Sequence, residues 1–256
     1  MRETGVSRYI FIGADQIRMN ELPLITAHAG CMNTRLNSLE SVLAGINAGA
    51  DIVEVDVNVT KDRVAILFHD RYISLASQQR IALVDLTFQE LQAITNIVSL
   101  EEALDIAMQS GITFNLDLKT FACVAPMAKV VKSRNMADQV LISGCDKENA
   151  ARVKQLCPEF QILLNADQGV AACDQEQYER YIRQTCRDAI AAACCGINID
   201  YKDCREAFLA YARLRCLPVL LYTIDDLAEM ERFLRLGVHS ITTNDVHALR
   251  SLKKGR

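Results

Sequence analysis

Short apolar segments alternate along this chain with longer stretches in which apolar residues recur at helical spacing. Nine apolar segments have the length of buried strands: Leu24–Ala27, Ile52–Val57, Val64–Phe68, Thr113–Leu118, Val140–Ser143, Gln161–Asn165, Gly196–Ile199, Val219–Thr223 and Ser240–Thr243. Helical patterns lie between most of them: Ser38–Ala48, Leu100–Met108, Lys147–Leu156, Gln175–Cys194, Cys204–Arg215 and Asp225–Leu236. Strands that alternate with helices in this way predict a parallel sheet covered by helices.

Two of the nine segments are too close together to be neighbouring parallel strands. Only the sequence Asn-Val-Thr-Lys-Asp-Arg (58–63) separates Ile52–Val57 from Val64–Phe68. A parallel crossover needs about a dozen residues or more, so these two segments must form a hairpin. Eight parallel strands then remain, and they predict an α/β fold, a TIM (β/α)8 barrel with a β-hairpin excursion after its second strand.

Several side chains capable of catalysis or ligand binding fall late in the predicted strands. Glu54 and Asp56 are two residues apart, as are Asp117 and Lys119, so each pair shares one face of its strand. His28 directly follows the first strand. Active sites of this fold lie at the carboxyl ends of the strands, so we expect these five residues to meet in one site.

The hairpin brings a second histidine to the same end of the barrel. Pairing about a turn centred near Lys61 and Asp62 places His69 opposite Glu54. The site then holds two proton carriers, three carboxylates and a lysine. This set of groups is typical of metal-assisted phosphodiester chemistry.

The carboxylates favour a hard divalent cation. Three clustered carboxylates without a cation would repel one another, and oxygen ligands alone favour Mg²⁺, Ca²⁺ or Mn²⁺ over zinc. The structural alternative is that Glu54 and Asp56 are held in ion pairs with Lys61, Lys119 or Arg71. Lys119 itself has two open roles, which are to bind a phosphate group or to neutralise the neighbouring carboxylate.

Composition narrows the class of protein. The chain has 256 residues, half of them hydrophobic, and a net charge of −4 with no basic stripe, which argues against a nucleic-acid partner. No apolar run is long enough to be a transmembrane segment, and Tyr9–Gly13 is too short for the apolar part of a signal peptide. No linker rich in Pro, Gly or Ser appears, so we expect residues 1–256 to form a single domain with a core over about 23–250.

The cysteines indicate a reducing compartment. There are ten of them and no C-x-x-C pair, and the adjacent Cys194 and Cys195 suit neither a simple disulfide nor a common zinc spacing. Since no export signal is visible, we expect reduced, mostly buried thiols in a cytoplasmic protein.

Six short segments occur in a definite order along the chain. They read HAG from His28, RLNSLES from Arg35, GADIVEVDV from Gly49, TKDR from Thr60, FHD from Phe68 and LDLK from Leu116. In this order they resemble the glycerophosphodiester phosphodiesterase family, whose segments run roughly His-Arg-Gly, Pro-Glu-Asn-Thr, Gly-Ala-Asp-x-x-Glu-x-Asp-Val, Thr-Lys-Asp-Gly, His-Asp and Glu-x-Lys. The resemblance extends from about Ile25 to Leu249, because the C-terminal LYTIDD…GVHSITTND is similar to the family's Trp-Thr…Gly-Val-Asp…Thr-Asp ending.

The resemblance implies a fold, an activity and a set of roles. The fold is a TIM barrel, and the activity is hydrolysis of a small-molecule glycerophosphodiester to glycerol 3-phosphate and an alcohol with a divalent cation, often Ca²⁺ or Mg²⁺. By the same resemblance Glu54, Asp56 and Asp117 are the metal ligands, and His28 and His69 are the acid/base pair.

Two departures from the family pattern lie on one short loop. Ala29 stands where the family has arginine, and Leu36 stands where it has glutamate. A basic and an acidic residue lost together indicate the removal of an interacting pair. Arg35 or Arg71 is our candidate for the missing phosphate-binding cation.

Two further departures concern the site itself. Asp117 replaces a glutamate, which shortens the ligand by one methylene, and Tyr222 replaces the tryptophan of the Trp-Thr segment. We expect Lys119 to hold the phosphate and Tyr222 to line the pocket for the alcohol.

Two alternatives to glycerophosphodiester hydrolysis remain open. One is a related hydrolase or lyase that acts on another phosphodiester, where a lyase would stop at a cyclic phosphate. The other is a degenerate barrel that binds a phosphodiester without cleaving it, which Ala29 and Leu36 favour. The oligomeric state is not predicted.

Overall fold

The computed structural model describes residues 22–74 and 80–255. Its strands are β1 (Leu24–Ala27), β2 (Ile52–Val59), β3 (Ala65–Leu67), β4 (Tyr72–Ser74), β5 (Arg80–Ala82), β6 (Val98–Ser99), β7 (Thr113–Leu118), β8 (Val140–Cys145), β9 (Gln161–Asn165), β10 (Gly196–Asp200), β11 (Val219–Tyr222) and β12 (Ser240–Thr243). Its α-helices are α1 (Leu39–Ala48), α2 (Phe88–Ile94), α3 (Leu100–Ser110), α4 (Val124–Ser133), α5 (Lys147–Leu156), α6 (Gln175–Ala191), α7 (Glu206–Leu214), α8 (Leu227–Leu236) and α9 (Val246–Lys254).

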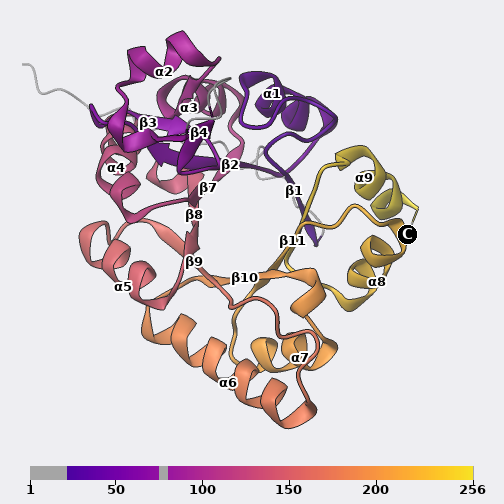
Figure 1. Ribbon diagram of the computed structural model, residues 1–256. Helices are drawn as coiled ribbons and strands as arrows, with labels where there is room; N and C mark the ends of the chain where they lie inside the picture. The colour runs from indigo at the N-terminus through magenta and orange to yellow at the C-terminus, as the bar shows by residue number, and fades with distance from the viewer. Residues whose placement is uncertain (1–21, 75–79, 256) are drawn as a thin grey trace, which may run out of the picture.

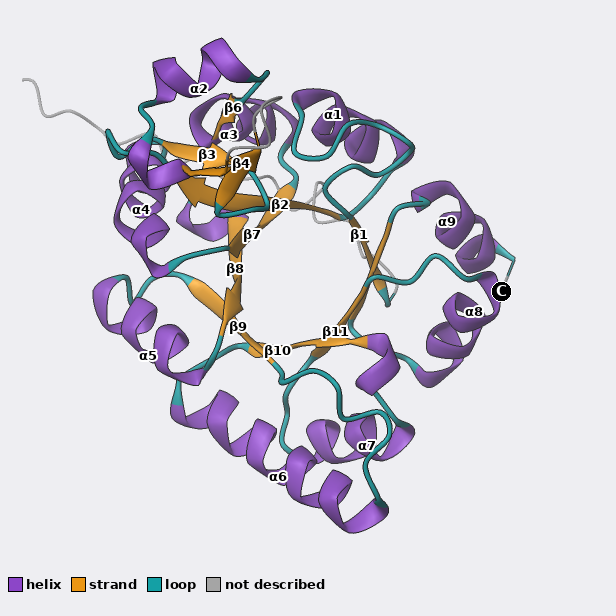
Figure 2. Ribbon diagram, in the orientation of Figure 1, coloured by secondary structure: helices purple, strands orange, loops and turns teal. Residues whose placement is uncertain are grey.

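Eight parallel strands close into a barrel. They follow the order β1, β2, β7, β8, β9, β10, β11 and β12, and β12 pairs with β1 to complete the ring. Figure 1 looks along the barrel, and Figure 2 shows the helices forming a layer outside the strands. The predicted TIM barrel is therefore confirmed.

Capping residues explain where the first helices begin and end. Ser38 accepts a hydrogen bond from the backbone N–H of Ser41, and Gly49 ends α1 in the left-handed region at φ 85°. Ser99 and Glu102 form a reciprocal capping box at the start of α3. A side chain that accepts from the first turn satisfies a donor with no partner inside the helix. These starts follow directly from the sequence.

The hairpin after β2 forms, but the predicted register was wrong by one residue. Val57 pairs with Leu67 and Val59 pairs with Ala65, and this register continued along β2 places Val55, not Glu54, opposite His69. The cause is a three-residue turn over 61–63 in place of the expected two-residue centre.

Contacts within the turn fix this longer loop. The backbone N–H of Thr60 donates to the carbonyl oxygen of Val64 at 3.1 Å, which closes the turn. Its side-chain hydroxyl donates to Asp62 at 2.6 Å, and Arg63 adopts a left-handed φ of 66°. An odd number of loop residues shifts the pairing by one position.

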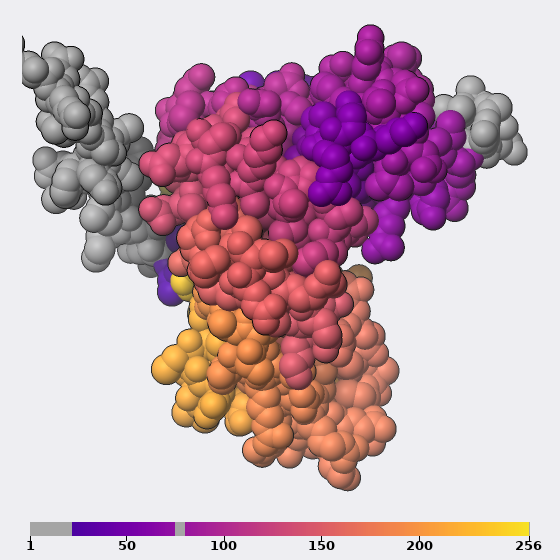
Figure 3. Space-filling view, turned by 90° about the vertical axis from the view of Figure 1, so that its left-hand side faces the viewer, coloured from indigo at the N-terminus to yellow at the C-terminus, as the bar shows by residue number. Residues whose placement is uncertain are grey.

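The excursion is larger than the sequence indicated. β3 also pairs with β6, β4 pairs with β5, and α2 packs nearby around a small apolar core of Ile66, Ile73, Leu83, Leu91 and Ile97. In the side view of Figure 3 these purple residues stand out from the barrel at the upper right. The elements β4, β5, β6, α2, α4 and α9 were not predicted.

The interior of the barrel is apolar at its base and polar above. Leu141, Leu163 and Leu220 pack together inside it. Higher up, Thr26 and Ser240 lie with their hydroxyl oxygens 2.8 Å apart. The lining of the site described below is likewise polar.

Some expectations are only partly covered by the described residues. The residues used to exclude a signal peptide, Tyr9–Gly13, lie outside them, so the single domain over 1–256 and the cytoplasmic location stay predictions. Among the described residues, no helix is both long and apolar enough to cross a membrane. All ten cysteines are free thiols, and six of them are buried.

Candidate active site

A cavity of about 280 Å³ opens at the carboxyl end of the barrel. All eight barrel strands, or the residues that follow them, contribute to its lining. It brings together seven of the predicted site residues: His28, Glu54, Asp56, His69, Asp117, Lys119 and Tyr222. The structure therefore brings these seven predicted residues together in one cavity.

Three carboxylates form a compact cluster in this cavity. Asp56 of β2 is in register with Asp117 of β7, and Glu54 lies two residues earlier on β2. One ligand oxygen of each of the three lies within 4.8 Å of the others. Side chains two residues apart on a strand point to the same face, which is why all three point into the barrel.

Glu54 is a buried member of the cluster. One of its oxygens accepts the backbone N–H of Ala29 at 3.0 Å. Burial, and then the charges of Asp56 and Asp117, raise the pKa of Glu54 well above its usual range. The carboxyl therefore favours its neutral form until a positive charge approaches.

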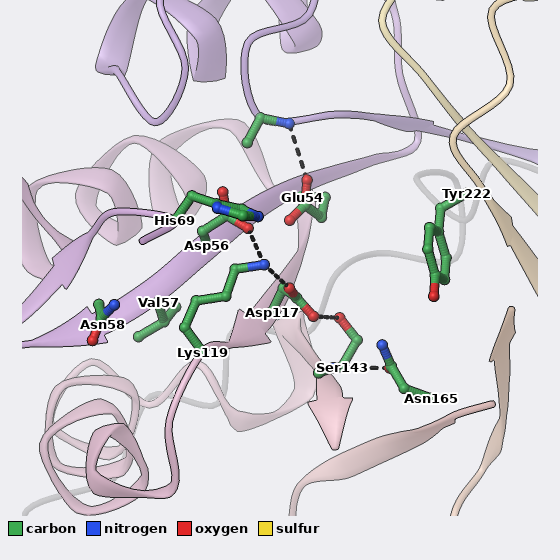
Figure 4. Close-up of polar contacts among 12 residues, drawn as sticks. Glu54, Asp56, Val57, Asn58, His69, Asp117, Lys119, Ser143, Asn165 and Tyr222 are labelled. Carbon is green, nitrogen blue, oxygen red and sulfur yellow. Dashed lines mark hydrogen bonds and ion pairs between the residues drawn. The ribbon is translucent and has the colours of Figure 1, made fainter. Parts of the chain in front are cut away.

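Lys119 already supplies one positive charge. Its ammonium lies 2.7 Å from Asp56 and also pairs with Asp117 (Figure 4). Burial lowers the pKa of Lys119, but the two carboxylates outweigh this effect and raise it. Of the three cations considered in the structural alternative, only Lys119 pairs with these carboxylates among the described residues; Lys61 and Arg71 do not.

Asn37 holds Asp56 from the other side. Its amide nitrogen donates to the Asp56 carboxylate at 2.7 Å, and its oxygen accepts the backbone N–H of Asp56 at 3.0 Å. Asn37 is buried at a left-handed φ of 56°. We did not predict this role, although Asn37 lies in the RLNSLES segment that carries the family resemblance.

The protonation pattern of His28 follows from its neighbours. The carboxylate of Asp225 accepts two hydrogen bonds from Asn244. One comes from the backbone N–H at 2.8 Å, and the other comes from the side-chain amide nitrogen at 2.7 Å. The Oδ1 atom of Asn244 therefore faces Nδ1 of His28, at 2.9 Å. Since this oxygen can only accept, His28 carries its proton on Nδ1 and presents Nε2 as an acceptor.

This acceptor nitrogen lies at the carboxylate cluster. Nε2 of His28 is 3.9 Å from Glu54. Asn244 and Asp225 come from the end of the chain, and neither was predicted as a site residue. The signal available was only the similarity of the SITTND segment to the family's Thr-Asp ending.

His69 occupies the outer rim of the cavity. It follows β3 on the hairpin, and its side chain is 57% exposed. Its Nδ1 atom lies 2.8 Å from the carboxylate of Asp70, which accepts the ring N–H. This bond leaves Nε2 as the nitrogen that is free to act on a ligand.

The two candidate arginines do not line the cavity. Arg35 donates to the backbone oxygen of Asn96 at 2.7 Å, and Arg71 donates to the backbone oxygen of Lys119 at 3.3 Å. Lys119 is consequently the only lysine or arginine among the described lining residues. Within residues 22–74 and 80–255, no arginine therefore takes the place of the one that Ala29 replaces.

The donor set fits a hard divalent cation. The three carboxylates have oxygens close enough together to bind one ion, and carboxylate oxygens are ligands that Mg²⁺, Ca²⁺ and Mn²⁺ prefer. The side-chain oxygen of Asn115, two residues before Asp117 and in register with Glu54, is buried without a hydrogen-bond partner. An orphaned oxygen beside three carboxylates is a further sign of a missing positive or hydrogen-bonding group.

Comparison with known proteins agrees with this geometry. The chain is 22% identical over 251 residues to a glycerophosphodiester phosphodiesterase of Caldanaerobacter subterraneus subsp. tengcongensis, which covers 91% of this chain and 98% of the relative. It is 24% identical over 238 residues to the glycerophosphodiester phosphodiesterase of Bacillus subtilis, with 80% of this chain and 78% of the relative covered.

Solved structures show the same fold. A putative glycerophosphoryl diester phosphodiesterase from Silicibacter pomeroyi superposes with a TM-score of 0.80 at 16% identity, over 92% of this chain and 94% of that chain. An Oleispira antarctica phosphodiesterase in complex with the product sn-glycerol-3-phosphate gives a TM-score of 0.75 at 22% identity, over 91% and 97%. Residues 28–248 match the glycerophosphoryl diester phosphodiesterase family as a whole, and the chain therefore belongs to that family.

Proposed function

We propose that this protein hydrolyses glycerophosphodiesters to glycerol 3-phosphate and an alcohol in a reaction that depends on a divalent cation. The observation that carries the proposal is that one cavity of a member of this family holds two imidazoles beside three clustered carboxylates. Such a cavity offers both proton transfer and charge stabilisation, which phosphodiester cleavage requires.

Glu54, Asp56 and Asp117 would hold the cation, which is Mg²⁺, Ca²⁺ or Mn²⁺ by the chemistry of its ligands. When bound, this ion supplies positive charge that polarises the phosphate and stabilises its transition state. Lys119 lies at the edge of the cluster, and its ammonium is the nearest protein cation for a phosphate oxygen.

We assign the general base to His28. Its Nδ1 proton is held by Asn244, so Nε2 can take a proton from the attacking group. That group is either water or the neighbouring hydroxyl of the glycerol unit. Attack by the hydroxyl would form a cyclic phosphate, which water would then hydrolyse.

We assign the general acid to His69. Asp70 fixes its ring through Nδ1, and its exposed place at the rim suits an alcohol that leaves toward solvent. The remaining ring nitrogen would protonate the departing alkoxide oxygen.

Hydrolysis of two substrates tests this proposal. Purified protein is incubated with glycerophosphocholine and with bis(4-nitrophenyl) phosphate, each in Mg²⁺, Ca²⁺, Mn²⁺ or EDTA. We expect release of glycerol 3-phosphate that EDTA abolishes and that His28→Ala and His69→Ala both prevent. Cleavage of the aryl diester alone would point to another natural phosphodiester, and a cyclic phosphate as the final product would indicate a lyase.

One observation favours a second candidate, a barrel that binds a phosphodiester without cleaving it. No arginine lines the cavity among the described residues, and Leu36, in place of a glutamate, is 47% exposed. Binding of a glycerophosphodiester without turnover in any of the three metals would support this candidate and contradict catalysis.

A further inference from the structure

The mouth of the cavity divides into a charged half and an uncharged half. Strands β1, β2 and β7, together with the hairpin, contribute every ionisable acid, lysine and histidine of the lining. Strands β8 to β12 and the residues after them contribute only amide and hydroxyl side chains among the described lining residues. The phosphate chemistry belongs to the first half, so a substituent of the phosphate must occupy the second.

Two asparagines form the centre of the uncharged half. Asn165 of β9 and Asn198 of β10 are in register, and the Oδ1 atom of Asn165 accepts both the backbone N–H of Gly144 at 2.8 Å and the Asn198 amide at 3.4 Å. These bonds occupy one end of each amide. The nitrogen of Asn165 and the oxygen of Asn198 have no partner among the described residues.

The free ends of this pair are one donor, on Asn165, and one acceptor, on Asn198. Figure 4 shows the Asn165 nitrogen next to the space between Ser143 and Tyr222. Asn198 is only 8% exposed, so bulk water has little access to its unused acceptor oxygen. A hydroxyl group both donates and accepts, and therefore matches this pattern.

A second pair repeats the pattern on the far wall. Gln168 donates its amide to the hydroxyl oxygen of Tyr222 at 3.0 Å, which leaves the phenolic O–H and the Gln168 carbonyl oxygen for a ligand. Burial raises the pKa of Tyr222, so the phenol keeps its proton at neutral pH. Neither pair changes charge under ordinary conditions.

Other substituents fit this half poorly. A quaternary ammonium is bound by carboxylates or by a cage of aromatic rings, and Tyr222 is the only aromatic residue among the described lining residues. An acidic group would need a cation here, and an acyl chain would leave buried amides without partners. A chain of hydroxyl-bearing carbons satisfies them.

We propose that the uncharged half seats an uncharged polyol substituent of the phosphate, with Asn165 and Asn198 as specificity-determining residues. The proposal rests on the phosphodiesterase function proposed above. Two parts of a substrate have this chemistry, the glycerol unit itself and a sugar or inositol head group.

The test compares three substrates in the wild-type enzyme and in Asn198→Leu. The substrates are glycerophosphoinositol, glycerophosphocholine and bis(4-nitrophenyl) phosphate, which has no hydroxyl-bearing substituent. We expect Asn198→Leu to lower kcat/KM for glycerophosphoinositol by about 10- to 100-fold, because a buried hydroxyl loses its partner. The aryl diester should change by less than about 3-fold, since neither of its aryl groups has a hydroxyl that Asn198 could bind.

The controls separate folding from specificity. Asn47→Leu makes the same replacement on the exposed face of α1 and should leave all three rates unchanged. If the larger side chain of Asn198→Leu lowers the melting temperature, Asn198→Ala is tested instead, since its smaller side chain leaves room for water. An equal loss for glycerophosphocholine would place the glycerol unit in this half, and a loss restricted to glycerophosphoinositol would place the head group there.

Two results would overturn the proposal while leaving the phosphodiesterase function standing. One is an unchanged kcat/KM for both glycerophosphodiesters in Asn198→Leu. The other is an equal loss for the aryl diester, which would make Asn198 a residue that positions the phosphate site. Failure of the wild-type enzyme to cleave either glycerophosphodiester would instead overturn the proposed function, and this inference with it.

Discussion

Asn244 fixes the tautomer of His28 from the opposite end of the chain. The two side chains are 216 residues apart in sequence, and their Nδ1 and Oδ1 atoms are 2.9 Å apart. The orientation of the Asn244 amide is itself determined by Asp225, which accepts its hydrogens at 2.7 Å. The proposed base thus depends, for the presentation of Nε2 to the cavity, on the connection between the first and last strands of the barrel.

Removing the acceptor should impair proton transfer more than binding. We expect Asn244→Leu to lower kcat by about 100-fold, the lower end of what general-base catalysis contributes, with a small change in KM. Asp225→Asn should cost less, because the Asn244 amide can still adopt the productive orientation part of the time. Steady-state kinetics over a range of pH values measures both effects, and a wild-type kcat in Asn244→Leu would exclude the positioning role.

The two histidines should respond differently to the leaving group. If His69 is the general acid, His69→Ala should lower the rate by about 100-fold or more for glycerophosphocholine, whose alcohol needs a proton. The loss should be much smaller for bis(4-nitrophenyl) phosphate, because 4-nitrophenolate leaves as a stable anion. His28→Ala should impair both substrates. The opposite pattern would exchange the assigned roles.

The sequence predicted most of the barrel, for a physical reason. Buried parallel strands are continuous apolar runs, and β1, β7, β9 and β12 have the bounds that their runs indicated. The position of the site followed from the same runs, because strand ends meet at one face of a closed barrel.

The remaining features depend on contacts that a linear pattern does not contain. Arg35 could have pointed into the cavity but donates instead to Asn96, 61 residues away. The Asn37 contact with Asp56 requires both the turn before α1 and the second strand. The short elements of the excursion, such as β4, are too brief to show a period.

The strained backbone of Arg63 in the hairpin turn leads to a prediction about stability. It adopts a φ of 66°, a conformation that costs a residue with a Cβ atom about 1 kcal/mol or more. Glycine, which the family pattern has here, adopts it freely. We expect Arg63→Gly to raise the free energy of unfolding by about 0.5–1 kcal/mol in denaturant titrations.

The neighbouring lysine provides the control for this prediction. Lys61 lies in the same turn but is not among the residues with positive φ, so Lys61→Gly should be neutral or destabilising. Equal effects of the two replacements would show that backbone strain at Arg63 is not the cause.

Glu54 should make the metal-free protein less stable as pH rises. Its pKa in the folded protein is raised by burial and by Asp56 and Asp117, whereas the unfolded chain ionises near the usual value of about 4.3. Between these two pKa values the folded state binds a proton that the unfolded state has released, so stability falls as pH increases. Above the raised pKa, ionised Glu54 is buried among like charges.

Glu54→Gln removes this dependence. In EDTA we expect the variant to melt above the wild-type protein at pH 8 and close to it at pH 4. Adding a divalent cation should reverse the order at pH 8, since only the ionised carboxylate attracts the ion. A melting difference that is the same at both pH values would contradict a raised pKa at Glu54.

Lys119 and a divalent cation should be partly interchangeable as sources of positive charge. The lysine side chain is 19% exposed and pairs with Asp56 at 2.7 Å and with Asp117. Breaking a largely buried pair leaves uncompensated charge, so Lys119→Met should lower the free energy of unfolding in EDTA by roughly 3 kcal/mol. Millimolar Ca²⁺ or Mg²⁺ should restore part of this loss, because the ion would neutralise the same carboxylates.

The surface pair of Lys132 and Glu159 provides the matched comparison. Their side chains are 47% and 38% exposed, and Lys132→Met should cost much less stability than Lys119→Met, with no response to the cation. If Lys119→Met is equally mild and equally insensitive to the cation, Lys119 is not a counter-ion of the cluster. A raised KM in that variant would then leave phosphate binding as its role.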